Sequence, residues 1–157
     1  MDRRTKNVDI FKDSVDCMNG NSRLQQAIKK SVNKQKLYLE AEKIDVPDRK
    51  GLSCKTIVST KRSFEAASVY ARAGKKVAVL NFASSTNPGG GVTHGSSAQE
   101  ECLCRCSTLY PCLNIDVMWN KFYKPHRKAG NPLYNDDCLY TPEVIVFKSD
   151  ISFPERM

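Results

Sequence analysis

Apolar residues recur at helical spacing through the first part of the chain. Residues 5–18 and 22–42 combine Lys, Gln and Glu with spaced Leu, Ile and Val, and Asn19-Gly20-Asn21 separates the two stretches. This pattern predicts two helices, the second with Ser22 as its N-cap. Proline, glycine and charged residues interrupt the pattern at 45–53, so we expect a loop there.

The pattern changes to alternating strand and helix signals beyond the loop. Apolar or β-branched runs at 56–59 and 77–80 predict strands, and residues 63–73 predict a helix that begins near Ser63 and ends at Gly74. The second run is almost entirely apolar, which is typical of a strand buried on both faces of a parallel sheet. Together these elements form a βαβ unit. A further strand is expected at 142–147.

The change of pattern divides the chain into two parts. Residues 1–50 form an N-terminal helical extension, and residues 51–157 form the main domain, with a single structural unit overall. The expected fold class is α/β.

The second predicted strand leads into a glycine run at 89–91, so these glycines lie at the carboxyl end of a strand, where α/β folds bind ligands. Ser97-Ala98-Gln99-Glu100 has the form of a capping box and predicts a helix start. Four residues then recur at helical spacing: Cys102, Cys106, Leu109 and Leu113. We expect these four on the buried face of the helix and Cys104 on another face. Residues 114–140 are irregular, with an aromatic helical turn near 119–123.

Composition narrows the class of protein. The formal net charge of +8 lies in residues 1–100 and favours an anionic partner, although a solvated basic surface explains it equally well. Seven cysteines and a polar N-terminus argue against a disulfide framework and a secretory signal, so we expect free thiols and a cytoplasmic protein with no membrane partner. The spacing of Cys102, Cys104 and Cys106 does not match the paired spacing of zinc sites.

The glycine run is the first candidate for binding chemistry. Gly89, Gly90 and Gly91 allow positive φ and close approach of a ligand, so that successive N–H groups can surround a phosphate. A flexible hairpin or linker requires the same residues. The strand before the run and the helix after it favour the phosphate site.

Two adjacent carboxylates begin the following helix. Glu100 is explained by the capping box and the helix dipole. Glu101 is not needed for the cap, and neighbouring residues on a helix point about 100° apart. One carboxylate can therefore hold a sugar hydroxyl while the other donates a proton to a leaving oxygen, as glycosidic cleavage requires.

Residues 87–101, NPGGGVTHGSSAQEE, match the GGG-x(6–8)-QEE signature of poly(ADP-ribose) glycohydrolases, with a spacer of seven residues. The flanking strings VLNFASSTNPGGG and ECLCRCSTLYPCL resemble the microbial type of that family, which is built on a macrodomain. The resemblance covers most of the chain and implies a macrodomain-like α/β fold, with a mixed sheet flanked by helices. It also implies that ADP-ribose or poly(ADP-ribose) is the ligand and that ADP-ribosylated proteins are substrates.

The resemblance assigns a role to each residue of the motif. It implies that Glu101 is the catalytic acid and base, that Glu100 binds ribose hydroxyls and that Gln99 fixes the turn. It implies that Asn87 contacts the distal ribose. It also implies that the diphosphate is lined by Gly89, Gly90, Gly91, Val92 and Thr93. The implied mechanism uses no metal and no nicotinamide cofactor.

Members of this family continue well beyond the strand expected at 142–147, so the resemblance implies a domain truncated at its C-terminus, with an exposed sheet edge. Three functions stay open at this stage. The first is a poly(ADP-ribose) glycohydrolase and the second is a module that binds ADP-ribose without cleaving it. The third, a nucleic-acid binder that uses the basic N-terminal half, is the least favoured.

Overall fold

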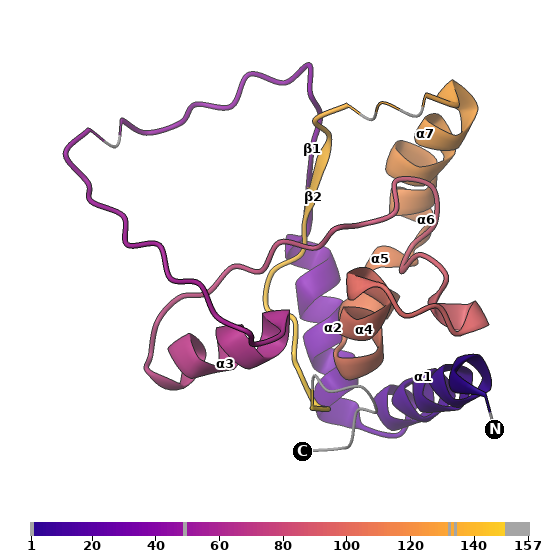
Figure 1. Ribbon diagram of the computed structural model, residues 1–157. Helices are drawn as coiled ribbons and strands as arrows, with labels where there is room; N and C mark the ends of the chain where they lie inside the picture. Colours follow the sequence, from indigo (N-terminus) through magenta and orange to yellow (C-terminus); the bar gives the residue numbers. More distant parts are fainter. Residues whose placement is uncertain (1, 49, 132, 134, 150–157) are drawn as a thin grey trace.

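The computed structural model describes residues 2–48, 50–131, 133 and 135–149, which form a helix-rich structure with a small sheet (Figure 1). Its helical elements are α1 (Arg3–Asn19), α2 (Ser22–Lys34), α3 (Ser63–Arg72), α4 (Gln99–Cys106), α5 (Leu109–Leu113), α6 (Asp116–Met118), α7 (Lys124–Ala129), the 3-10 turn η1 (Val92–His94) and the π-helical turn η2 (Trp119–Tyr123). Strands β1 (Lys36–Tyr38) and β2 (Cys138–Tyr140) pair antiparallel, with Leu37 opposite Leu139. No helix of the described residues is long and apolar enough to cross a membrane.

The two N-terminal helices predicted from the sequence are present, with different ends. The side chain of Asp2 caps α1 by accepting the N–H groups of Arg4 and Thr5 at 2.6 and 3.1 Å. Asn21, rather than Ser22, caps α2 in the same way. The second helix ends at Lys34 and not at residue 42, because the next residues pair with β2 instead.

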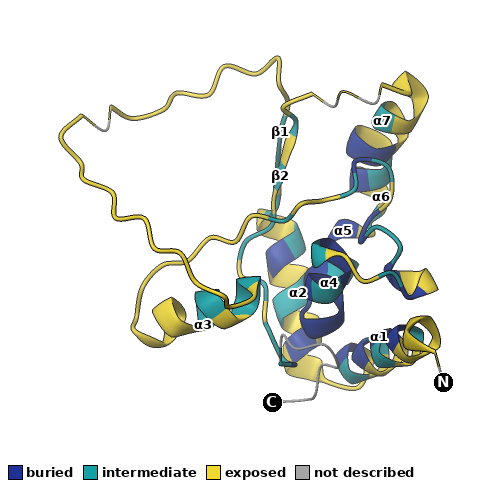
Figure 2. Cartoon of the chain, in the orientation of Figure 1, coloured by how far each residue is buried: buried dark blue, intermediate teal, exposed yellow. Residues whose placement is uncertain are grey.

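Helix α4 lies at the centre of the molecule and contacts α1, α5 and η1 (Figure 2). The main hydrophobic cluster joins it to α1, η1 and α5 through these buried residues: Phe11, Val92, Leu103, Cys104, Leu109 and Leu113. Cys106 is buried as expected, but the faces expected for the other two cysteines were wrong, because Cys104 is fully buried in this cluster and Cys102 is only half-buried. The helix ends at Cys106, and Ser107 is extended, so the helical spacing does not continue to Leu113.

The final described segment crosses the core and contacts both N-terminal helices. Ser107 and Val146 form an isolated antiparallel bridge, so the strand expected at 142–147 is reduced to one pair. The buried ammonium group of Lys148 donates to Ile10 O at 3.0 Å and to Ser14 Oγ at 2.7 Å, and lies 2.7 Å from an Asp13 carboxylate oxygen. A buried cation requires such partners, so these contacts fix the segment against α1.

The strands predicted at 56–59 and 77–80 are wrong, because neither segment is in a strand here. Residues 39–48 and 50–62 lie in a long, exposed arc between β1 and α3, and residues 73–83 are also largely exposed (Figures 1 and 2). Ile57, Val58 and Leu80 expose 59, 92 and 72% of their surface. An apolar run becomes a parallel strand only where neighbours pair with its backbone and cover its faces, and no described residue does so. Helix α3 between them is confirmed, and Gly74 after it has φ of 72°.

Candidate functional site

Gln99 connects the start of α4 to two neighbouring segments. Its side-chain oxygen accepts the N–H of Phe82 at 2.7 Å, and its amide nitrogen donates to Leu80 O at 2.8 Å and to Ser63 Oγ at 3.1 Å. Gln99 therefore fixes the chain that leads into the glycine loop, and its own amide is fully engaged.

Glu100 holds the next stretch of the same segment. One carboxylate oxygen accepts the Ser84 N–H at 2.7 Å, and the other accepts the Asn81 side-chain amide at 3.4 Å. The predicted capping box is therefore wrong, since Ala98 is the N-cap of α4 and no side chain caps the helix. Glu100 is 3% exposed, and burial raises the pKa of its carboxyl, while the Ser84 and Asn81 hydrogen bonds oppose that shift.

The buried carboxyl of Glu100 predicts a pH-dependent stability. Its folded pKa lies above the unfolded value of 4.5, so the stabilisation it gives is complete below that value and is lost as pH rises through the folded pKa. We expect the melting temperature of Glu100→Gln to rise relative to the unmodified chain as pH increases from about 4 to about 7. Thermal unfolding followed by circular dichroism measures this difference. A melting-temperature difference between the two proteins that stays constant over that pH range would contradict a raised pKa for Glu100.

Glu101 reaches the glycine loop itself. Its Oε1 accepts the Gly91 N–H at 2.9 Å, and Oε2 is buried with no hydrogen-bond partner among the described residues. The side chain is 7% exposed and lines a cavity. A buried carboxylate oxygen without a partner is uncommon and is available to a ligand. Of the two predicted carboxylates, Glu101 is thus the one with a free oxygen.

The glycine loop is shaped by contacts that exclude larger side chains. Gly89 and Gly90 have φ of 70° and 58°. A Cβ on Gly90 would lie 2.5 Å from Glu101 Oε1, and one on Gly89 would lie 2.7 Å from the ring of Tyr110. A Cβ on Gly91 would collide with the side chain of Ser96. The loop therefore packs directly against the carboxylates and the ring of Tyr110, as the sequence interpretation of a close backbone approach requires.

The loop N–H groups are not free, however. Gly90 N donates to Asn87 O at 3.0 Å, and Val92 N donates to Gly89 O at 3.1 Å, while Gly91 N is bound by Glu101. A diphosphate at this loop must therefore share these N–H groups with their present acceptors or displace the acceptors. Val92 is fully buried in the core and Thr93 is exposed, where its hydroxyl lies 3.0 Å from His94 Nδ1. Of these two residues, only Thr93 presents accessible surface to a ligand.

Arg127 is a site residue that the sequence interpretation missed. Its guanidinium donates from Nε to Thr86 O at 2.7 Å and from Nη2 to the side-chain oxygen of Asn87. It also lies over the Trp119 ring, 4.8 Å from the centroid. Arg127 thus holds the exposed Asn87, the first residue of the predicted binding set, in one orientation. The sequence marked this region only as an irregular stretch with an aromatic helical turn near 119–123, which did not point to the arginine.

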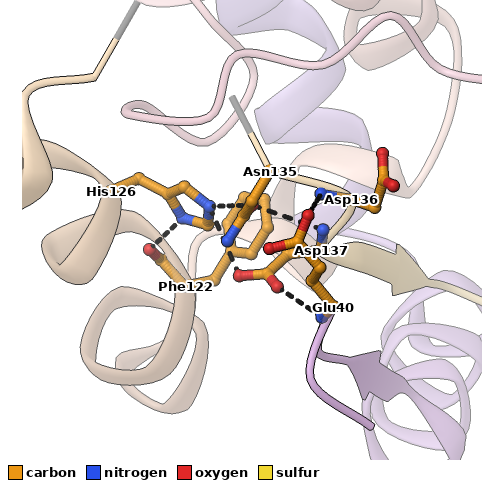
Figure 3. A network of polar contacts seen from close by, with 6 residues as sticks. All are labelled: Glu40, Phe122, His126, Asn135, Asp136 and Asp137. Atoms are coloured by element: carbon orange, nitrogen blue, oxygen red, sulfur yellow. Dashed lines mark hydrogen bonds and ion pairs between the residues drawn. The ribbon is translucent and has the colours of Figure 1, made fainter. Parts of the chain in front are cut away.

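His126, beside Arg127, anchors the same helix on its other side (Figure 3). Its Nδ1 lies 2.7 Å from Phe122 O, and its Nε2 lies 2.9 Å from Asn135 Oδ1 and 3.4 Å from Asp137 Oδ2. Asp137 in turn accepts the Glu40 N–H at 2.8 Å. This network joins α7 to the end of β1, so His126 supports the position of Arg127 and does not itself reach the glycine loop.

The described residues offer no alternative centre based on a metal. Within residues 2–48, 50–131, 133 and 135–149, no three His, Cys, Asp or Glu side chains are grouped to hold a metal ion. The chemistry available at the site is that of a buried carboxylate with one unpaired oxygen, a close-packed glycine loop and an arginine-held asparagine.

The family described as microbial-type PARG (poly(ADP-ribose) glycohydrolase), catalytic domain, matches residues 7–149, and the chain belongs to that family. Comparison with the curated proteins gave no significant match.

Solved structures of poly(ADP-ribose) glycohydrolase from Thermomonospora curvata are similar to the whole chain. One is 28% identical with a TM-score of 0.72 and covers 98% of this chain and 62% of its own. The same enzyme bound to the inhibitor ADP-HPD is 28% identical, with a TM-score of 0.76 and coverage of 98 and 60%. A variant of it with one glutamate changed to alanine is 27% identical, with a TM-score of 0.75 and the same coverage. The chain thus spans about 60% of the length of these structures.

Proposed function

We propose that this chain hydrolyses the ribose–ribose O-glycosidic bond of poly(ADP-ribose) and releases ADP-ribose. The observation that carries the proposal is the geometry of Glu101, which lines a cavity: its Oε1 accepts the Gly91 N–H, while its buried Oε2 has no hydrogen-bond partner among the described residues. The glycohydrolase from T. curvata binds ADP-HPD, and its structure resembles this chain over 98% of the chain's length. We further propose that the arrangement around the loop is macrodomain-like.

The reaction divides into two steps at one carboxyl group. Protonated Glu101 donates its proton to the 2′ oxygen of the leaving ribose, and the bond from that oxygen to the anomeric carbon breaks with its electron pair on the oxygen. The remaining sugar is an oxocarbenium-like cation. Glu101, now ionised, takes a proton from water as the water oxygen bonds to the anomeric carbon. The products are ADP-ribose and a shortened polymer, and Glu101 is again protonated.

The other predicted residues bind and orient the substrate in this proposal. Glu100 accepts ribose hydroxyls through lone pairs left after its two protein contacts, because each carboxylate oxygen can accept more than one hydrogen bond. Asn87 contacts the distal ribose, and the backbone from Gly89 to Thr93 lies along the diphosphate. ADP-ribosylated proteins are proposed as substrates that carry the polymer.

Release of ADP-ribose tests the proposal. We expect the chain to liberate ADP-ribose from purified poly(ADP-ribose), measured by chromatography of the soluble nucleotide. Binding of ADP-ribose is measured on the same preparation by calorimetry. Binding without release would show an ADP-ribose recognition module in place of an enzyme. The absence of both would contradict the proposed ligand class.

Arg127 should affect ligand affinity through its hold on Asn87. Arg127→Lys keeps the charge but cannot donate to Thr86 O and Asn87 together from one planar group, so the loop loses its fixed orientation. We expect ADP-ribose to bind about three- to tenfold more weakly, since a hydrogen bond contributes ~1 kcal/mol. Calorimetry compares this variant with Lys128→Ala, a change at the exposed neighbouring residue. Equal affinities for the two variants would show that Arg127 does not position the loop.

A further inference from the structure

Arg105 is a buried cation without a carboxylate partner. Its side chain is 2% exposed, and no carboxylate among residues 2–48, 50–131, 133 and 135–149 forms an ion pair with it. Nη1 donates to Ser96 O at 2.6 Å, and Nη2 donates to Cys102 Sγ at 3.2 Å. Nε is buried and has no hydrogen-bond partner in the part of the chain that the structure describes. A buried charge normally has an opposite charge beside it, and here the group in contact is a thiol.

The unpaired donor lies on the edge of the guanidinium that contacts the cysteine. In an arginine side chain, the Nε–H bond and one N–H bond of Nη2 are parallel, and together they bind two acceptors. Cys102 offers only its sulfur to this edge. An oxygen bonded to that sulfur would be held at the same edge by its own covalent bond and would supply the second acceptor. The buried guanidinium is therefore better matched by an oxidised Cys102 than by the thiol.

Cys102 is accessible to a small oxidant. The residue is half-buried, and the contact of its Sγ with Ser97 O, at 3.7 Å, lies at the exposed surface. Ser97 and Ala98 are themselves exposed. Cysteine is oxidised as the thiolate, and an arginine in contact with the sulfur stabilises the negative charge on it. Accessibility and a neighbouring cation are thus combined at Cys102.

The other cysteines lack this combination. Three of them are fully buried in the core, namely Cys104, Cys106 and Cys112. Cys54 and Cys138 are more exposed than Cys102, but no described arginine donates a hydrogen bond to either sulfur. Exposure alone would make these two react first, whereas the contact with Arg105 favours Cys102.

Arg105 also holds the spacer between the glycine loop and α4. Asn7 donates to Gly95 O at 3.0 Å and fixes the spacer from the side of α1. Arg105 fixes the next residue from the opposite side, through its hydrogen bond to Ser96 O. The guanidinium is the only side chain among the described residues that donates to this carbonyl.

Ser96 connects this hydrogen bond to the glycine loop. Its N–H donates to Gly91 O at 3.1 Å, and its side chain lies so close to Gly91 that a Cβ there would collide with it. The N–H of Gly91 is bound in turn by Glu101, which directly precedes Cys102 in α4. A displacement of the Arg105 guanidinium therefore reaches Glu101 through two residues.

We propose that Cys102 is a reversible oxidation site, at which a hydroperoxide converts the thiol to a sulfenic acid and lowers the activity of the neighbouring carboxylate site. The sulfur attacks one oxygen of the hydroperoxide, an S–O bond forms, and the O–O bond breaks with its electron pair on the departing oxygen. That oxygen takes up the thiol proton and leaves as an alcohol or water. The sulfur is oxidised and the hydroperoxide is reduced. The new oxygen binds the Nε and Nη2 edge of Arg105 and draws the guanidinium away from Ser96 O.

Labelling of sulfenic acid at each cysteine tests the modification. The unmodified chain is treated with substoichiometric hydrogen peroxide in the presence of dimedone, and peptide mass spectrometry compares its seven cysteines. We expect Cys102 to be labelled about tenfold faster than Cys54 and Cys138. Arg105→Gln removes the cation and should abolish this preference. Labelling of the unmodified chain in the order of exposure, with Cys54 and Cys138 first, would refute the site whether or not the variant folds.

The effect on activity rests on the proposed function and is measured separately. After peroxide treatment we expect ADP-ribose release to fall about tenfold, as small displacements of catalytic groups cause, and to recover after reduction with dithiothreitol. Cys102→Ser, whose hydroxyl also accepts from Arg105, should keep its rate throughout. Loss of rate in Cys102→Ser, or an unchanged rate in the oxidised chain, would disconnect Cys102 from the carboxylate site. A chain that never releases ADP-ribose refutes the proposed function, and the labelling still decides whether Cys102 is the oxidation site.

Discussion

Glu101→Gln should abolish ADP-ribose release from poly(ADP-ribose) and leave ADP-ribose binding in place. Glutamine keeps the volume of the side chain and an oxygen that accepts the Gly91 N–H, so the loop stays anchored. It cannot deliver a proton to the leaving oxygen or take one from water. Loss of a general acid and base lowers rates by about 10² to 10⁴, and we expect a decrease of at least that size.

The measurement is an initial rate of ADP-ribose release, with affinity determined separately by calorimetry. Glu42→Gln, at an exposed position, is the matched control and should retain the full rate. Glu101→Ala adds a second effect, because it also removes the acceptor for Gly91 N, so it should weaken binding where Glu101→Gln does not. A Glu101→Gln variant that releases ADP-ribose at the original rate would exclude this residue as the acid.

Gly90→Ala should abolish both binding and release while the chain stays folded. The new Cβ would lie 2.5 Å from Glu101 Oε1 and 3.2 Å from Glu100 Oε2, so the carboxylates must move away from the loop. The end of a side chain moves at little cost to stability, but here the moved atoms are the proposed catalytic ones. The φ of 58° adds strain of about 1–2 kcal/mol.

Gly74→Ala is the control that separates backbone strain from displacement of the carboxylates. Gly74 has φ of 72°, and a Cβ there would meet nothing within 4 Å. The two variants should lose similar stability in thermal melts, and only Gly90→Ala should lose ADP-ribose affinity in calorimetry. Equal affinities of the two variants would show that the loop does not touch the ligand at Gly90.

The local elements of this chain were predictable because their signals are local. The two N-terminal helices follow from spacing, and α3 follows from its apolar pattern and from Gly74 at its end. The structure brings Glu101 to the glycine loop, where its Oε1 accepts the Gly91 N–H, and the short spacer of residues 92–98 allows this contact. Caps were less predictable, since Asn21 and Ala98 took positions that Ser22 and Ser97 could equally have taken.

The sheet was not predictable, because pairing depends on residues distant in sequence. Apolar runs at 56–59 and 77–80 have strand composition, yet no described residue pairs with them, so they stay exposed. Residues 36–38 instead form a strand, although the sequence pattern included them in a helix over 22–42.

Arg127 and Asn7 were missed for the same reason. Their contacts span 41 and 88 residues of sequence, and a lone arginine or asparagine on a helix carries no sign of its partner.

The central claim, that ADP-ribose binds along the glycine loop with Glu101 beside it, is tested most directly by backbone amide NMR during titration with ADP-ribose. The account predicts that the largest shifts fall on Gly89, Gly90, Gly91 and Thr93, with a further shift at Glu101. Shifts confined to the basic residues of α1 and α2, with the glycine loop unchanged, would contradict it.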